Sequence, residues 1–248
     1  MVRGRRETRL PAPFLRSIRL REPEVPLPER YPFTLPWLDP DFELLFEQPV
    51  TIIVGENGSG KSTVLEAIAA LSGFGASGGG AWKGNDLSED AEDAEALAAH
   101  LRAGWLPKVG RGWFLKAQGF AAVGSLTAKN YLGFSHGEGF VEMILDRMSE
   151  QGVFLFDEPE AALSPRKQAE LLRFLSEIQS EATSQVILAT HSPILMAVPE
   201  ADIIQISHRG LQRIHFRDTD HFRLWSAFTA DPDDFVAAAI EGRIGDLA

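Results

Sequence analysis

A glycine-rich segment at residues 55–63 combines backbone and side-chain groups that are suited to binding a phosphate. Glycines let consecutive backbone N–H groups surround a phosphate, and a following helix directs the positive end of its dipole at the same anion. Lys61 is placed to reach the β- and γ-phosphates of a nucleotide, and Ser62 to bind Mg²⁺. The segment consists of Gly55, Glu56, Asn57, Gly58, Ser59, Gly60, Lys61, Ser62 and Thr63.

The flanking residues give this segment the context that a phosphate loop requires. Five β-favouring residues, 50–54, precede it, and Val64, Leu65, Ile68 and Leu71 follow it at helical spacing. A strand, a phosphate loop and a helix are therefore predicted in that order. The alternative is a glycine-rich turn that matches by chance, and the flanking pattern weighs against it.

Two adjacent acids, Asp157 and Glu158, end a continuous apolar run at residues 153–156. Such a run predicts a strand buried on both faces, where carboxylates are costly unless they have a role. One carboxylate can hold Mg²⁺, and the next can take a proton from a water that attacks the γ-phosphate, while Lys61 neutralises charge. The alternative is a helix-capping acid with a solvated neighbour. The position of the pair, about a hundred residues after the phosphate loop, favours phosphoryl transfer.

A second apolar run, residues 186–190, delivers His191 at its C-terminal end. A single histidine at the end of a strand is usually a hydrogen-bonded structural residue. If this strand belongs to the sheet that carries the phosphate loop, however, His191 lies at the carboxyl edge, where ligand sites of α/β proteins occur. We therefore include His191 among the candidate catalytic residues.

The remaining elements must position these groups. Helices are predicted from Ser88 to Leu101, from near Ser135 to Met148, and from Pro165 onward, with two more in the C-terminal tail. Residues 113–117 are predicted to form a strand that leads to Gln118, and residues 104–112 a loop. The runs 203–206 and 211–216 flank a turn and predict an antiparallel hairpin.

The predicted fold class is α/β, with a mainly parallel central sheet flanked by helices, a small helical lobe and an antiparallel β element.

Composition limits the classes of function. The formal net charge of −11 argues against a broad nucleic-acid-coating surface. The chain has no cysteine, which excludes a disulfide framework and a cysteine nucleophile. No apolar run approaches the roughly 18 to 20 residues of a membrane helix, and the N-terminus lacks an apolar signal core. We therefore expect a cytoplasmic protein without membrane insertion.

A single domain over residues 1–248 is expected, with three distinctive parts. Residues 1–13 begin an arginine-rich arm that either contacts nucleic acid or an acidic partner or is simply solvated. Residues 73–112 form a glycine-rich and acidic insertion. Residues 119–150 form a small helical lobe.

Taken together, these motifs resemble the ATP-binding-cassette (ABC) class of P-loop ATPases. Residues 55–62 match its Walker A motif, and residues 153–158 match Walker B with its adjacent glutamate. Gln118 falls at the Q-loop position, and the segment 134–138 is similar to the cassette signature. Ala161-Ala162-Leu163-Ser164 resembles the D-loop, and Thr190-His191 the switch histidine. All six occur in the order of the family.

The resemblance implies a head-to-tail homodimer that forms on ATP and encloses two ATP molecules. Ser135 and Gly137 of one copy would contact the γ-phosphate bound to the phosphate loop of the other. Glu158 would be the general base, Asp157 and Gln118 Mg²⁺ ligands or water positioners, and His191 a γ-phosphate sensor. The implied cofactors are thus ATP and Mg²⁺.

The signature departs from the transporter pattern. His136 replaces the first glycine and Glu138 the usual glutamine, a form more similar to soluble AAA-family ATPases of the cassette class and to chromosome-maintenance and DNA-repair relatives. That group often carries an acid where Gln118 stands, and the segment containing Ser135 could also be an ordinary helix cap. Tyr31 lies where transporter-type ATPases place an adenine-stacking aromatic, although aromatic residues between prolines more often simply pack.

The leading hypothesis is a Mg²⁺-dependent ATPase that dimerises around ATP and drives a conformational change on a partner, either nucleic acid or a second protein. Two alternatives remain. One is a nucleotide-gated binding module with negligible hydrolysis, and the other is the ATPase subunit of a membrane transporter.

Overall fold

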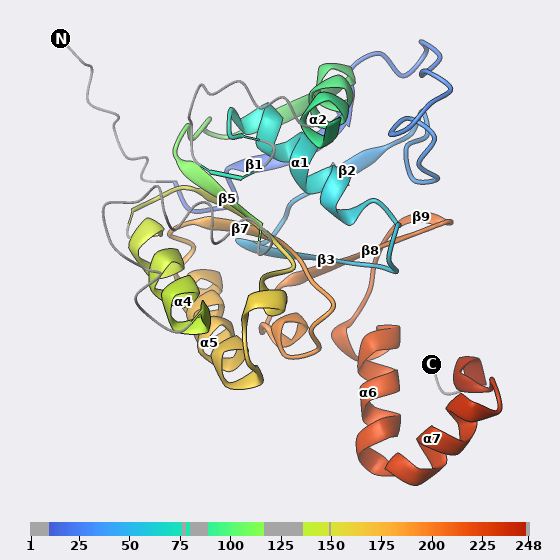
Figure 1. Cartoon of the computed structure of the whole chain (residues 1–248). Coiled ribbons are helices and arrows are strands. Elements are labelled where there is room, and N and C mark those ends of the chain that lie inside the picture. Colours follow the sequence, from blue (N-terminus) through green and yellow to red (C-terminus); the bar gives the residue numbers. More distant parts are fainter. Residues whose placement is uncertain (1–9, 76–77, 80–88, 117–135, 149, 247–248) are drawn as a thin grey trace.

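The computed structural model describes residues 10–75, 78–79, 89–116, 136–148 and 150–246 (Figure 1). Its centre is a six-stranded sheet in the order β5-β6-β7-β3-β8-β9. The pairs β5–β6, β6–β7, β7–β3 and β3–β8 are parallel, and only β9 runs antiparallel to its neighbour within this sheet. The strands are β3 (Val50–Val54), β5 (Gly112–Lys116), β6 (Val153–Asp157), β7 (Gln185–Ala189), β8 (Asp202–Ser207) and β9 (Gly210–Arg213). The predicted α/β fold class is confirmed.

Helices cover both faces of this sheet, as Figure 1 shows. Helices α1 (Lys61–Ser72) and α2 (Glu89–His100) lie on one side, and α4 (His136–Arg147) and α5 (Pro165–Glu181) on the other. Two apolar clusters accordingly form, one with α1 and α2 and the other with α4 and α5. The strands β3, β6 and β7 are buried along their whole length because both clusters enclose them.

A smaller antiparallel sheet lies on the α1 and α2 side, in the order β2-β1-β4. It contains β1 (Leu15–Leu20), β2 (Glu43–Leu45) and β4 (Leu101–Trp105). Strand β4 corrects two sequence expectations, since the predicted helix ends before Leu101 and part of the predicted loop 104–112 is strand. Leu101 pairs with Leu20, and Gly104 with Ser17, so pairing with β1 outweighs the local helical pattern.

The C-terminal part forms two helices, α6 (Asp220–Ala230) and α7 (Pro232–Ile240), which extend away from the central sheet (Figure 1). The Thr219 side chain caps α6 by accepting a hydrogen bond from Phe222 N, and Asp231 caps α7 in the same way from Asp234 N. Among the described residues, the short 3₁₀ turns are η3 (Pro159–Ala162), η4 (Leu195–Ala197), η5 (Phe216–Asp218) and η6 (Ile244–Asp246).

Several predictions concern residues outside the described part. These are Gln118, Ser135, most of the helical lobe, residues 76–77 and 80–88 of the glycine-rich insertion, and the first nine residues of the arginine-rich arm. Within the described residues, no helix combines the length and apolarity needed to cross a membrane.

Candidate functional site

The phosphate loop joins β3 to α1, and the Trp37 side chain packs against it. Gly60, the residue before α1, has a φ of 95°, and a Cβ there would lie 2.8 Å from Trp37 Nε1. That indole nitrogen donates a hydrogen bond to Ser59 O at 2.9 Å. Glycine is therefore required at position 60 both by the left-handed backbone and by the neighbouring ring.

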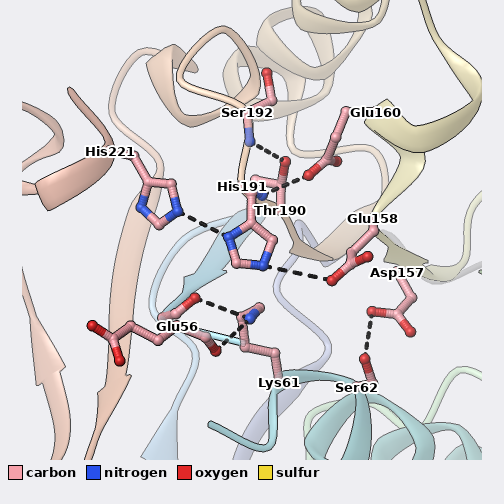
Figure 2. A network of polar contacts seen from close by, with 11 residues as sticks. Glu56, Lys61, Ser62, Asp157, Glu158, Glu160, Thr190, His191, Ser192 and His221 are labelled. Carbon is pink, nitrogen blue, oxygen red and sulfur yellow. Dashed lines mark hydrogen bonds and ion pairs between the residues drawn. The ribbon is translucent and has the colours of Figure 1, made fainter. Parts of the chain in front are cut away.

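Lys61 is the first residue of α1, and its side chain is buried beneath the loop. Its ammonium donates to Gly55 O and Glu56 O, both at 2.9 Å (Figure 2). Burial lowers the pKa of Lys61, while Glu158 and Asp157 oppose that change. The ammonium therefore lies at the loop, bound to two carbonyl oxygens that a phosphate could replace.

Ser62 and Asp157 bring two oxygen ligands together from different elements. Ser62 Oγ donates to Asp157 Oδ1 at 3.1 Å, which links the start of α1 to the end of β6. Burial raises the pKa of Asp157 to about 6, although the Ser62 hydrogen bond and Lys116 act in the opposite direction. A hydroxyl and a buried carboxylate are the hard oxygen donors that Mg²⁺ takes from proteins, so these two residues fit that ion.

Glu158 follows Asp157 in an uncommon backbone conformation. Its φ of 48° and ψ of 51° are left-handed, which is rare for a residue with a side chain. The Glu158 N–H donates to Ala189 O of the neighbouring strand at 2.9 Å. The turn directs the Glu158 carboxylate to within 3.6 Å of His191 Nε2.

His191 contacts the segment after β6 and the start of α6 (Figure 2). Its backbone N–H donates to Glu160 Oε1 at 2.5 Å, and its ring Nδ1 lies 2.9 Å from His221 Nε2. Burial lowers the pKa of His191, and Lys61 lowers it further, while Glu158 raises it. His191 thus lies at the carboxyl edge of the sheet with its Nε2 toward Glu158.

The structure therefore brings together Lys61, Ser62, Asp157, Glu158 and His191 from β6, β7 and the start of α1. Gly137 lies in the first turn of α4, and Gln118 and Ser135 lie outside the described residues. The assignment of roles to all of these residues remains a prediction.

Sequence reasoning did not identify Glu160 or His221. Glu160 is two residues after Glu158, so its place beside the acidic pair was a signal available in the sequence. His221 has no comparable signal, because only the fold brings α6 to the end of β7. Tyr31, by contrast, was noted, and its hydroxyl lies 2.6 Å from Thr63 Oγ1 at the start of α1. Adenine stacking on the half-exposed Tyr31 ring remains a prediction.

A cavity of about 270 Å³ lies beside the phosphate loop. Its lining includes Gly55, Glu56 and Asn57 of the loop together with His191 and His221. The loop and the two histidines therefore share one open space.

Comparison with known proteins places these features in a family. Residues 36–95 match a family model described as "AAA domain", and residues 140–197 one described as "AAA domain, putative AbiEii toxin, Type IV TA system". The chain is 30% identical over 168 residues to the thiamine import ATP-binding protein ThiQ of Cereibacter sphaeroides, which covers 57% of this chain and 70% of that protein. It is 29% identical over 171 residues to the molybdenum import ATP-binding protein ModC of Bordetella pertussis, covering 58% of this chain and 46% of that protein.

A solved structure of an SMC head bound to the C-terminal winged-helix domain of ScpA has the same fold. Its TM-score is 0.51 at 12% identity, and the match covers 82% of this chain and 98% of that chain. The mainly parallel central sheet flanked by helices agrees with this shared fold. The chain belongs to the ABC class of P-loop ATPases.

Proposed function

We propose that this protein hydrolyses ATP with Mg²⁺ and uses the resulting conformational change on a partner. The observation that carries the proposal is the convergence of Lys61 and Ser62 with Asp157, Glu158 and His191 at one edge of the sheet. Phosphoryl transfer requires positioning and charge neutralisation more than covalent chemistry from the protein. This set of residues supplies both.

Binding begins at the phosphate loop. The backbone N–H groups of residues 55–60 and the N-terminus of α1 would hold the phosphates, and the Lys61 ammonium would exchange its two carbonyl partners for phosphate oxygens. Ser62 and Asp157 would hold Mg²⁺, which supplies charge neutralisation at the β- and γ-phosphates.

Glu158 would act as the general base. Its carboxylate lies at the end of β6, one residue beyond Asp157, and would accept a proton from the water that attacks the γ-phosphate. The left-handed turn at Glu158 and the bond from its N–H to Ala189 O leave the carboxylate within 3.6 Å of His191 Nε2. His191 would contact the γ-phosphate from the next strand, β7.

The site is expected to be completed by a second copy of the chain, with Ser135 and Gly137 contributing to the γ-phosphate site across a homodimer interface. This part of the proposal rests on the resemblance of residues 134–138 to the cassette signature. The partner on which the cycle acts is proposed to be nucleic acid or a second protein. Phosphate release measured with and without DNA at several salt concentrations distinguishes a specific stimulating partner from general electrostatic attraction.

Phosphate release under steady-state conditions tests the proposal. We expect Mg²⁺-dependent release by the wild type, loss of nucleotide binding in Lys61→Ala, and retained binding without turnover in Glu158→Gln. Glu177→Gln is the control, because Glu177 is an exposed residue of α5 paired with Arg173. ATP binding by the wild type without any phosphate release would instead indicate a nucleotide-gated binding module.

A second candidate function is the ATPase subunit of an importer. The similarity to ThiQ and ModC, whose names describe import ATP-binding proteins, favours it. Reconstitution with a membrane subunit encoded beside this chain is the test, and transport that depends on Lys61 would establish that function.

A further inference from the structure

Two histidines from distant parts of the chain meet beside the phosphate loop. His191 follows β7 and His221 is the second residue of α6, and His191 Nδ1 lies 2.9 Å from His221 Nε2 (Figure 2). Their ring centroids are 5.1 Å apart with an interplanar angle of 49°. A hydrogen bond between two neutral imidazoles requires an N–H on one ring and a lone pair on the other, so one of the two nitrogens is protonated.

The surroundings of His191 determine which nitrogen that is. His191 Nε2 lies 3.6 Å from Glu158 Oε1 and, within the described residues, is buried without a hydrogen-bond partner. An ionised carboxylate only accepts hydrogen bonds, so a lone pair on Nε2 would face like charge. Nε2 is therefore the protonated nitrogen of a neutral His191, and Nδ1 carries the lone pair. It follows that His221 Nε2–H is the donor in the pair.

The charges around the pair favour the neutral form of both rings. Burial lowers the pKa of His191 and of His221, and Lys61 lowers both further. Glu158 opposes this at His191, and Asp220 and Glu160 oppose it at His221. The imidazolium form, with protons on both nitrogens of His191, is thus disfavoured by the surroundings as a whole.

The start of α6 fixes the position of His221. Thr219, which is buried, donates its hydroxyl to Phe216 O at 2.8 Å and accepts from Phe222 N at 3.1 Å. These two bonds hold the residues on either side of His221. The His221 ring consequently lies against His191 in the cavity that the phosphate loop also lines.

We propose that His221 is a positioning residue that holds His191 in the Nε2–H tautomer, so that His191 presents a fixed hydrogen-bond donor to the phosphate site. The tautomer follows from the geometry of this chain alone, and its effect on turnover rests on the proposed ATPase function. In neutral imidazole the two tautomers interconvert readily, and a partner at one nitrogen selects the form at the other. Without His221, only the contact of Nε2 with Glu158 would favour the proton on that nitrogen, and Nδ1 would lose the donor that occupies its lone pair.

The first test observes the tautomer in the nucleotide-free full chain. Nitrogen-15 NMR of the imidazoles distinguishes protonated from unprotonated ring nitrogens, and spectra of His191→Gln and His221→Gln assign the signals among the six histidines. The expected result is a protonated Nε2 and an unprotonated Nδ1 in His191. Protonation of His191 at Nδ1, or at both nitrogens, would overturn the proposal whether or not the protein hydrolyses ATP.

The second test separates positioning from general structural support. In His221→Gln the amide nitrogen can replace the Nε2–H donor, whereas His221→Leu has no donor. We expect kcat for phosphate release to fall about tenfold in His221→Leu, with KM for ATP little changed, and to be largely retained in His221→Gln. His208→Leu, at the exposed turn between β8 and β9, is the matched control.

Thermal unfolding of all three variants verifies that the comparison is made on folded protein. Equal loss of kcat in His221→Gln and His221→Leu would show that the donor is not what matters, and unchanged kcat in His221→Leu would show that His221 has no positioning role. Absence of hydrolysis in the wild type would contradict the proposed function, and the NMR result would still decide the tautomer.

Discussion

Asp157 is a buried carboxylate whose folded environment favours its protonated form. Burial raises its pKa from 3.8 to about 6, so at neutral pH the folded chain carries a charge that the unfolded chain accommodates more easily. We predict that Asp157→Asn stabilises the nucleotide-free protein at pH 7.5 in EDTA by up to about 3 kcal/mol. The asparagine oxygen can still accept the Ser62 hydrogen bond. Chemical unfolding of both proteins measures the difference, with exposed Asp41→Asn as the control.

The raised pKa of Asp157 also sets the direction in which stability changes with pH. The unfolded state loses the Asp157 proton near pH 4, whereas the folded state retains it to about pH 6. The wild type therefore loses stability relative to Asp157→Asn as pH rises between these values, and the difference is constant above them. A difference between the two proteins that stays the same from pH 4 to pH 7 would contradict this assignment.

Gly60 and Gly58 provide a matched pair in the phosphate loop. Both have positive φ, 95° and 77°, but a Cβ at Gly60 would meet Trp37 and Leu35, while one at Gly58 would meet nothing within 4 Å. Alanine at Gly58 should cost about 1 kcal/mol for the backbone alone. Alanine at Gly60 should cost clearly more because the Trp37 ring must also move. Urea unfolding without nucleotide tests this, and equal losses would mean that the Trp37 contact does not constrain the loop.

At the scale of elements, Gln185 connects the two sheets. This fully buried residue of β7 accepts hydrogen bonds from Phe14 N and Leu15 N and donates to Leu15 O, which fixes the start of β1 to the central sheet. We predict that Gln185→Leu lowers the free energy of unfolding by roughly 3 kcal/mol or more, because three buried backbone groups lose their partners. Gln212→Leu, on exposed β9, is the control, and a similar effect of both substitutions would refute the role of Gln185.

The elements that the sequence predicted well are those with strong local patterns. The strands before the phosphate loop, before Asp157 and before His191 are runs of β-favouring, mostly apolar residues. The structure places all three side by side in the buried centre of one sheet. Their carboxyl ends meet because the strands are parallel, so the juxtaposition of Lys61 with Asp157 and His191 could be anticipated.

The missed features depend on contacts between distant residues. Strand β4 follows directly from α2, and nothing in the local sequence shows that β1 will pair with it. Gln185 looks like a polar residue at the edge of an apolar run, although it is buried by β1, 170 residues away. His221 is separated from His191 by 30 residues and reaches it only because the chain passes through β8, β9 and η5 first.

In the whole molecule, the phosphate loop, the acids and the histidine of the site all belong to one copy of the chain. The resemblance to the ABC class implies that the signature contacts come from a second copy. We predict that Glu158→Gln with Mg²⁺ and ATP is a stable dimer by light scattering and a monomer with ADP. The double variant Lys61→Ala, Glu158→Gln is the control and should stay monomeric with ATP, because it lacks the phosphate contact. A dimer whose population does not change with nucleotide would contradict ATP-dependent assembly.

Glu158, which follows β6, is proposed to remove the proton from the attacking water in ATP hydrolysis. Single-turnover cleavage of radiolabelled ATP, with bound nucleotide quantified in the same samples, separates this step from binding and product release. We predict that Glu158→Gln binds ATP as the wild type does and cleaves it at least about 100-fold more slowly. Cleavage of bound ATP by Glu158→Gln at the wild-type rate would contradict it.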